Sequence, residues 1–129
     1  MTFHTKHFKL VEARQTLLRA TPLVEEMIAL KASLDEHGLD VRRHPFFGGA
    51  GPNGERYFPR ELERLVEILG ELDGLGIQIK NIDQGLIDFP HLRASGEEVY
   101  LCHLAGEPDI DWWHPLEIGF AGRRPVSEL

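Results

Sequence analysis

The sequence predicts a two-layer α+β fold in which an antiparallel pair of long helices packs on a four-stranded antiparallel β-meander. Apolar residues recur at steps of three and four in the first part of the chain, and after Gly76 they recur at every second residue. Because a helix pair and a sheet each leave one apolar face uncovered, we expect the two to cover each other. We expect a single domain over residues 1–129, helical over about 8–75, with the sheet and the C-terminal segment over about 76–129.

The first helix is expected from Lys9 to His37, where apolar residues form one stripe and Gly38 follows as a C-terminal cap. The stripe consists of Leu10, Ala13, Leu17, Val24, Met27 or Ile28, and Leu34. Pro22 interrupts the run, and Thr21-Pro22 could also begin a second helix, so one kinked helix and two consecutive helices both fit. We favour one long kinked helix.

The second helix is expected to begin at Pro59, to end at Gly74 or Gly76, and to pair antiparallel with the first. Its stripe consists of Leu62, Leu65, Val66, Leu69 and Leu72. A first helix from Lys9 to His37 would be roughly 43 Å long, which exceeds the extent of a four-stranded sheet. We therefore predict a homo-oligomer that self-associates through the helices.

The segment from Arg42 to Arg56 is rich in glycine and proline and is expected to be a mobile surface loop. Residues 49–54 fit the dinucleotide pattern G-x-G-x-x-G. No expected strand leads into them, however, and Pro52 lacks the N–H that such a loop offers to phosphate. The P-loop pattern fails because Glu55-Arg56 stands where lysine and serine or threonine are needed.

Alternating apolar residues and turn signals predict the strands of the meander. A hairpin is expected over residues 77–89, with Gly85 at positive φ in its turn and Pro90 at its end. Two further strands are expected over 97–104 and 109–113, separated by the turn at 105–108. Connections this short favour antiparallel pairing in consecutive order.

Composition limits the classes of function. With 14 Lys and Arg against 21 Asp and Glu, the formal net charge is −7, which disfavours nucleic acid as a partner. The single cysteine cannot form an internal disulfide. We find neither a signal-like start nor an apolar run near the roughly 20 residues of a membrane span. We expect a cytoplasmic protein with no membrane partner.

The strongest candidate site lies in residues 112–125, WWHPLEIGFAGRRP. Pro115 drives His114 into an extended conformation at a strand end, and Glu117 falls in the turn that follows. In one interpretation Glu117 caps this turn through backbone N–H groups. In the other, His114 and Glu117 face a cleft as acid–base groups or as metal ligands, with further ligands such as Asp88 or His91 supplied by the fold.

Two arginines belong to the same candidate site. Arg123 and Arg124 either pair with carboxylates such as Glu117 and Asp88 or bind a small anion. The candidate ligand-binding residues are therefore Asp88, Trp113, His114, Glu117, Arg123 and Arg124.

Neighbouring residues on a strand point to opposite faces of the sheet. We therefore expect one of Trp112 and Trp113 in the core and the other on the outer face. The same alternation separates Cys102 from His103, which excludes a nucleophile–base pair. We expect Cys102 to be a small buried hydrophobe.

Three segments carry a family resemblance: 79–90 (IKNIDQGLIDFP), 99–107 (VYLCHLAGE) and 112–125. They are similar to a bacterial family catalogued only as domain of unknown function 2203, whose helix opening is resembled more loosely by Phe8, Glu12-Ala13 and Leu17. The family pattern W-H-x-L-(D/E)-x-G-(F/Y)-x-G-R falls on Trp113, His114, Leu116, Glu117, Gly119, Phe120, Gly122 and Arg123. The chain departs from the family at His103-Leu104, where an aromatic and a basic residue would be expected. The resemblance implies no assigned activity, cofactor or substrate.

Two classes of function fit these observations. The first is a non-catalytic interaction or assembly module that buries its helices and an exposed tryptophan against another copy or another protein. The second is a small-anion or metal-binding protein, which could extend to an enzyme, with its site beside the meander. We prefer the first because no catalytic signature is present. The sequence names no cofactor and leaves the question of enzymatic activity open.

Overall fold

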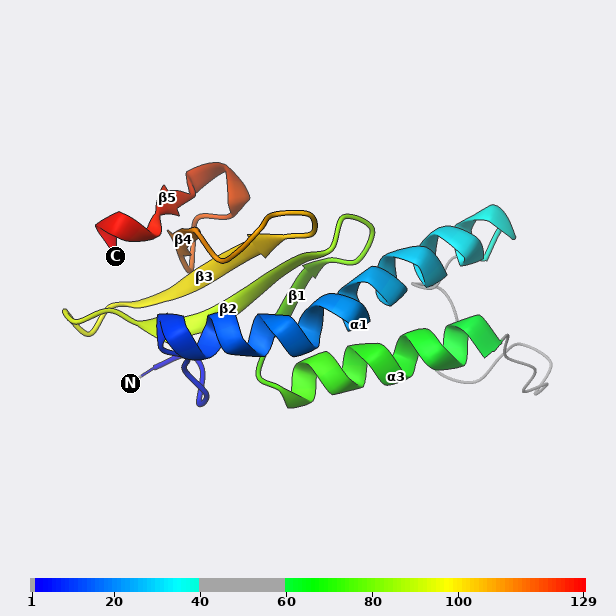
Figure 1. Cartoon of the computed structure of the whole chain (residues 1–129), viewed down its shortest axis with the longest axis horizontal. Coiled ribbons are helices and arrows are strands. Elements are labelled where there is room, and N and C mark those ends of the chain that lie inside the picture. The colour runs from blue at the N-terminus through cyan, green and yellow to red at the C-terminus, as the bar shows by residue number, and fades with distance from the viewer. Residues whose placement is uncertain (1, 40–59) are drawn as a thin grey trace.

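We describe a computed structural model of the chain over residues 2–39 and 60–129. The helices in this part are α1 (Leu10–Glu36) and α3 (Arg60–Gly74). They precede an antiparallel sheet with the strand order β1-β2-β3-β4-β5 (Figure 1). The strands are β1 (Gln78–Asn81), β2 (Leu86–Leu92), β3 (Glu98–Leu104), β4 (Trp112–Pro115) and β5 (Arg124–Pro125), with short 3-10 helices at Phe120–Gly122 and Val126–Glu128.

The α+β class, the helix pair and the antiparallel meander are confirmed, but the predicted number of strands was wrong. The sheet has five strands because the chain returns after β4 and residues 124–125 pair with Trp112 and Trp113. The loop expected over 42–56, with its glycine pattern at 49–54, lies outside the described residues.

α1 is one continuous helix that runs through Pro22, as we favoured from the sequence. At its C-terminal end Gly38 has φ +73°, and the N–H of Leu39 donates to the Leu34 carbonyl at 2.9 Å. The buried residues of α1 are Ala13, Leu17, Ala20, Val24, Met27, Lys31 and Leu34. Because a proline inside a helix costs about 3 kcal/mol, tertiary packing of this stripe rather than local propensity sustains the helix.

α1 lies along one face of the sheet, and α3 runs antiparallel beside it (Figure 1). Phe89, Leu101 and Trp113 form a row across β2, β3 and β4. All three are at most 1% exposed, and they share one core with the buried residues of both helices. Burying a side chain of this size contributes about 1.5–3 kcal/mol, so this row is a large part of the contact between the layers.

The β1–β2 turn fits closely against α1. Gly85 has φ +69°, as its place in the turn predicted. A Cβ at this position would lie 2.7 Å from Ile28 Cδ1 and 2.8 Å from Ala105 Cβ, so only glycine fits without a shift of its neighbours. Lys31 of α1 also reaches this turn, where its Nζ lies 2.8 Å from Asp83 Oδ1.

The segment before α1 lies along the part of β2 that β1 leaves unpaired. β1 pairs with β2 only as far as Asp88. Beyond that point the N–H of Phe8 donates to the Pro90 carbonyl at 2.7 Å, and His91 Nδ1 lies 2.6 Å from the Phe8 carbonyl oxygen. The segment therefore covers backbone groups that would otherwise form an open sheet edge.

Glu98 of β3 fastens the same segment. Its carboxylate accepts hydrogen bonds from the N–H groups of Phe3 at 2.6 Å and His4 at 2.9 Å, and from His7 Nε2 at 2.7 Å. Burial alone would raise the pKa of Glu98, but these donors outweigh it and hold the pKa at about 2. The ionised form of Glu98 is therefore the one that holds the N-terminal segment.

We predict that Glu98→Gln lowers the free energy of unfolding by about 1–3 kcal/mol at neutral pH, because three donors lose a charged acceptor. The folded pKa of about 2 lies below the ordinary value of 4.5, so ionised Glu98 adds stability above pH 4.5. That contribution is lost as the pH falls from 4.5 toward the folded pKa of about 2. Urea unfolding of the parent protein and of Glu98→Gln, from pH 7 to pH 2, should therefore show that their difference in free energy of unfolding decreases in acid. Glu117→Gln is the control, because Glu117 is exposed and its carboxylate has no partner in the described residues, and an equal loss there would contradict this assignment.

Candidate functional site

Asp88 of β2 and His114 of β4 meet on the face of the sheet away from α1. His114 Nε2 lies 3.0 Å from Asp88 Oδ2, and the two side chains are 4% and 1% exposed. The other ring nitrogen, Nδ1, lies 2.8 Å from the Pro115 carbonyl oxygen. Both ring nitrogens of His114 are thus engaged within the protein.

Cys102 of β3, the strand between them, completes a cluster. It pairs in register with Asp88, and one donor atom from each of Asp88, Cys102 and His114 lies within 4.8 Å of the other two. Cys102 is fully buried, as we expected for a small hydrophobe. Asp88 Oδ1 is buried without a hydrogen-bond partner. We refer to these three residues as the Asp–Cys–His cluster.

The cluster does not form an activated thiol. Burial raises the pKa of the Cys102 thiol, and the neighbouring Asp88 carboxylate raises it further, so the group is neutral near pH 7. Burial lowers the pKa of His114, but its bonds to Asp88 and to the Pro115 carbonyl outweigh this effect and raise the pKa overall. A nucleophilic cysteine needs a histidine nitrogen free to take its proton, and His114 has none.

The two tryptophans occupy opposite faces, as predicted. Trp113 lies in the core and its Nε1 donates to the Pro125 carbonyl at 3.1 Å, whereas Trp112 is 37% exposed. The guanidinium carbons of Arg93 and Arg124 lie 4.6 and 5.4 Å from the Trp113 ring centroid. Trp113 thus lies in the core with Arg124 beside its ring, on the other face of the sheet from the Asp–Cys–His cluster.

Arg123 pairs with Glu107, a residue that our sequence reasoning did not name. Arg123 Nη2 lies 2.7 and 2.8 Å from the two carboxylate oxygens of Glu107, which also accepts the N–H of Leu104 at 2.7 Å. The guanidinium lies 5.1 Å from the Trp112 ring centroid and 4.6 Å from that of Phe120. A Gly-Glu pair in the turn after a buried strand is the signal that could have pointed to Glu107.

Glu117 does not join these groups. Its side chain is exposed, and within residues 2–39 and 60–129 it forms no hydrogen bond or salt bridge. The structure therefore brings together Asp88 and His114 with Cys102, and separately Arg123 with Glu107.

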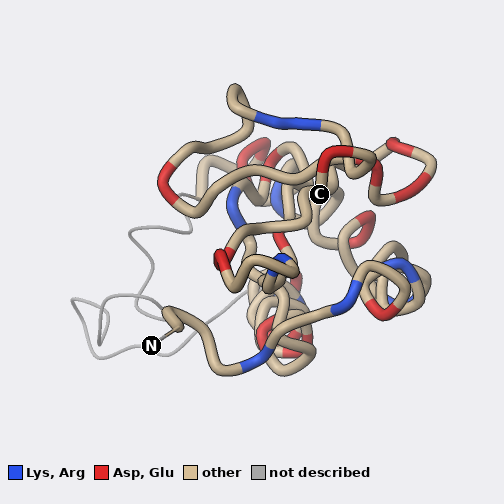
Figure 2. Tube along the Cα trace, turned by 90° about the vertical axis from the view of Figure 1, so that its left-hand side faces the viewer, with Lys and Arg blue, Asp and Glu red and all other residues tan. Residues whose placement is uncertain are grey.

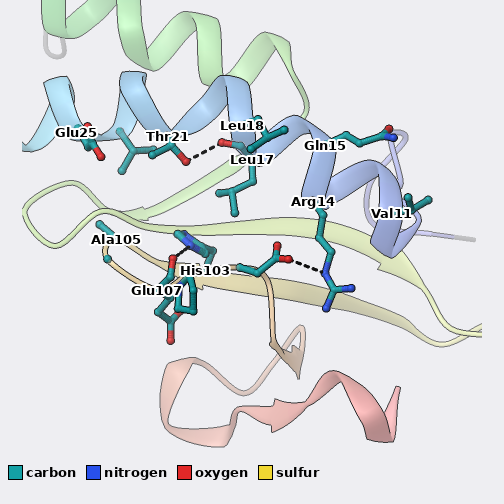
Figure 3. A pocket seen from close by; sticks show the side chains of 14 residues that line it. Val11, Arg14, Gln15, Leu17, Leu18, Thr21, Glu25, His103, Ala105 and Glu107 are labelled. Carbon is teal, nitrogen blue, oxygen red and sulfur yellow. Dashed lines mark hydrogen bonds and ion pairs between the residues drawn. The ribbon is translucent and has the colours of Figure 1, made fainter.

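A groove lies on the opposite face of the sheet, between α1 and the β3–β4 turn. Its volume is about 590 Å³. Figure 3 shows the side chains of α1 along one wall and those of His103, Ala105 and Glu107 along the other. His103 and Cys102 thus point to opposite faces, as the alternation along β3 predicted. The groove and the Asp–Cys–His cluster are separate features.

The chain matches the family described as Uncharacterized conserved protein (DUF2203) over residues 6–126. The chain belongs to this family. The family match spans both helices, the five strands and the whole Asp–Cys–His cluster, and its description assigns no activity. No curated protein and no solved structure matches the chain. Among the described residues of this family member, no helix is long and apolar enough to cross a membrane.

We predict that Glu107→Gln lowers the free energy of unfolding by about 1–3 kcal/mol, because it removes the charged partner of a largely buried arginine. Glu117→Gln should change it by no more than about 0.5 kcal/mol, since its carboxylate contacts no partner in the described structure. Urea unfolding at neutral pH measures both. A larger loss for Glu117→Gln than for Glu107→Gln would show that Glu117, not Glu107, supports the C-terminal segment.

Proposed function

We propose that this protein is a non-catalytic assembly module in which the first half of α1 packs against the same surface of a second copy. The observation that carries the proposal is the exposure of Leu18 and Val11, whose side chains are 78% and 59% exposed on a continuous helix. Both residues line the groove between α1 and the β3–β4 turn. Aliphatic side chains this exposed, beside a concave apolar surface, are typical of an interface.

The spacing of the two residues suits a pair of identical helices. Val11 and Leu18 are seven residues apart, so they lie on one side of α1 at a separation of about 10 Å along its axis. In an antiparallel arrangement about a two-fold axis, Val11 of each copy contacts Leu18 of the other. Gln15, which is uncharged, lies between them and lines the same groove.

The surface around Val11 and Leu18 differs from the one that we expected from the sequence, which was the part of the helices that extends beyond the sheet. The large apolar side chains that are exposed in the described residues are Phe3, Val11, Leu18, Leu92, Trp112, Ile118 and Phe120. None of them lies on α3 or on the second half of α1, where the helices extend beyond the sheet (Figure 1). The proposal therefore keeps self-association through a helix but uses the first half of α1.

Charge around the groove predicts how salt affects association. Glu25, Glu107 and Asp109 line it, and Arg14 is already held by Asp109 at 3.5 Å and Asp111 at 3.7 Å. Acidic positions also occur on the helices, on the turns and in the C-terminal segment (Figure 2). Two copies therefore repel each other, and added salt should strengthen their association. A basic partner in the same groove would be bound more weakly as salt rises.

The test is light scattering and sedimentation over a wide concentration range. The parent protein should rise toward twice the mass of one chain, and more so at higher salt. Leu18→Glu should remain monomeric, because it buries a charge against Val11 of the other copy. Phe3→Glu is the matched control, since Phe3 is 79% exposed and the substitution adds the same charge. A parent protein that is monomeric at every concentration and salt, or an equal effect of both variants, would refute the proposal.

A further inference from the structure

The hydrogen bonds of His114 demand an additional positive charge in the Asp–Cys–His cluster. The Pro115 carbonyl oxygen can only accept, so the Nδ1 that lies 2.8 Å from it carries the ring proton. In a neutral ring, Nε2 then presents a lone pair toward Asp88 Oδ2 at 3.0 Å. A lone pair and a carboxylate oxygen repel each other at this distance. Either a proton or a metal cation has to lie between them.

The cluster contains more atoms able to bind a metal ion than a shared proton would use. Cys102 Sγ lies within 4.8 Å of the ligand atoms of Asp88 and His114. All three residues are at most 3% exposed, so water does not compete for these atoms. Asp88 Oδ1 is buried without a partner at hydrogen-bond geometry, and a bound cation would satisfy it. A single metal ion would use all of these donors at once.

The donor set identifies the class of metal. Imidazole nitrogen, thiolate sulfur and carboxylate oxygen together suit Zn²⁺ and similar borderline-soft ions, whereas Mg²⁺ and Ca²⁺ prefer oxygen alone. A zinc-binding histidine usually donates its other ring N–H to a carbonyl or carboxylate, as His114 Nδ1 does here. Three protein ligands leave the fourth position of a tetrahedral site open.

We infer that Asp88, Cys102 and His114 bind one Zn²⁺ ion, which joins β2, β3 and β4 on the face away from α1. On binding, Zn–O, Zn–S and Zn–N bonds form, and two protons pass to solvent: the thiol proton of Cys102 and the proton shared by His114 and Asp88. The cluster is neutral before, with one carboxylate and one imidazolium, and neutral after, with Zn²⁺ balanced by a carboxylate and a thiolate. This exchange avoids the cost of an unpaired charge in a buried site.

The three candidate ligands are enclosed by the protein, and the C-terminal segment lies on the same side of the sheet. This side is opposite α1 (Figure 1), and Arg123 and Glu107 hold the segment to the β3–β4 turn. Because the ligands are buried beneath neighbouring chain, metal should enter readily only when the protein is unfolded or locally open. Loading is therefore best achieved by refolding the full chain in the presence of the ion.

Co²⁺ is the appropriate probe, since it takes zinc sites and its thiolate bond gives a charge-transfer absorption band. Cys102 is the single cysteine of the chain, so such a band can come from no other residue. The full-length protein is unfolded under reducing conditions, refolded with Co²⁺ and separated from free ion. We expect one Co²⁺ per chain, the thiolate band and the visible bands of tetrahedral Co²⁺. Zn²⁺ should displace the Co²⁺ and remove the bands, and a large excess of Mg²⁺ should not.

Three variants locate the site. Cys102→Ser should lose the thiolate band, and Asp88→Asn should bind Co²⁺ at least about tenfold more weakly, since even the loss of an outer partner costs 10–100-fold. His103→Gln, whose ring faces the groove, should keep the band. Should the cluster variants fail to fold, the parent protein still decides the matter. A refolded parent without bound Co²⁺, or with bound Co²⁺ and no thiolate band, would overturn the inference.

Discussion

The pairing of β2 with β3 determines where the other elements of this protein can lie. The two strands pair without interruption from Leu86 opposite Leu104 to Leu92 opposite Glu98. Alternation along this ladder places Phe89 and Leu101 on one face and Asp88 and Cys102 on the other. α1 can cover only the apolar face, and β4 extends that face with Trp113 and the other face with His114. A shift of one position would turn Asp88 toward α1 and the core residues outward, so the helical layer and the cluster both depend on this register.

Much of the fold could be predicted from the sequence because its elements repeat over several turns or alternations. The stripe of α1 continues across Pro22, and the β1–β2 hairpin has its glycine at the position that needs positive φ. β5 could not be predicted in the same way. Its two residues contain no period to detect, and Pro125 lacks the N–H typical of a strand residue. These residues become a strand only because the edge of β4 is available to pair with them.

The positions of the candidate site residues could be predicted only in part, for a related reason. Sequence reasoning placed Asp88 and His114 in one candidate site together with Glu117. Their contact requires three strands in one register, and no local pattern specifies that register. Cys102 was correctly expected to be buried, although burial alone did not indicate which side chains it would face. The contact of Arg123 with Glu107 likewise spans 16 residues and a turn. From the sequence we favoured the nearby Glu117 as a partner for His114 and Arg123. In the structure His114 contacts Asp88, and Arg123 contacts Glu107.

The attachment of the N-terminal segment to β2 has a consequence for how the chain folds. His91 contacts the Phe8 carbonyl across 83 residues of sequence, and the Phe8 ring packs edge-on against Phe89 with centroids 5.2 Å apart. The helix pair and the meander can each form from more local contacts. Contacts between α1 and the sheet close loops of 52 residues (Lys31 to Asp83) up to 96 residues (Arg14 to Ile110) and form slowly. Docking of the layers should therefore be the late step. Until it occurs, the apolar stripe of α1 and the apolar face of the sheet are open to other chains, and the net charge of −7 helps to keep those chains apart.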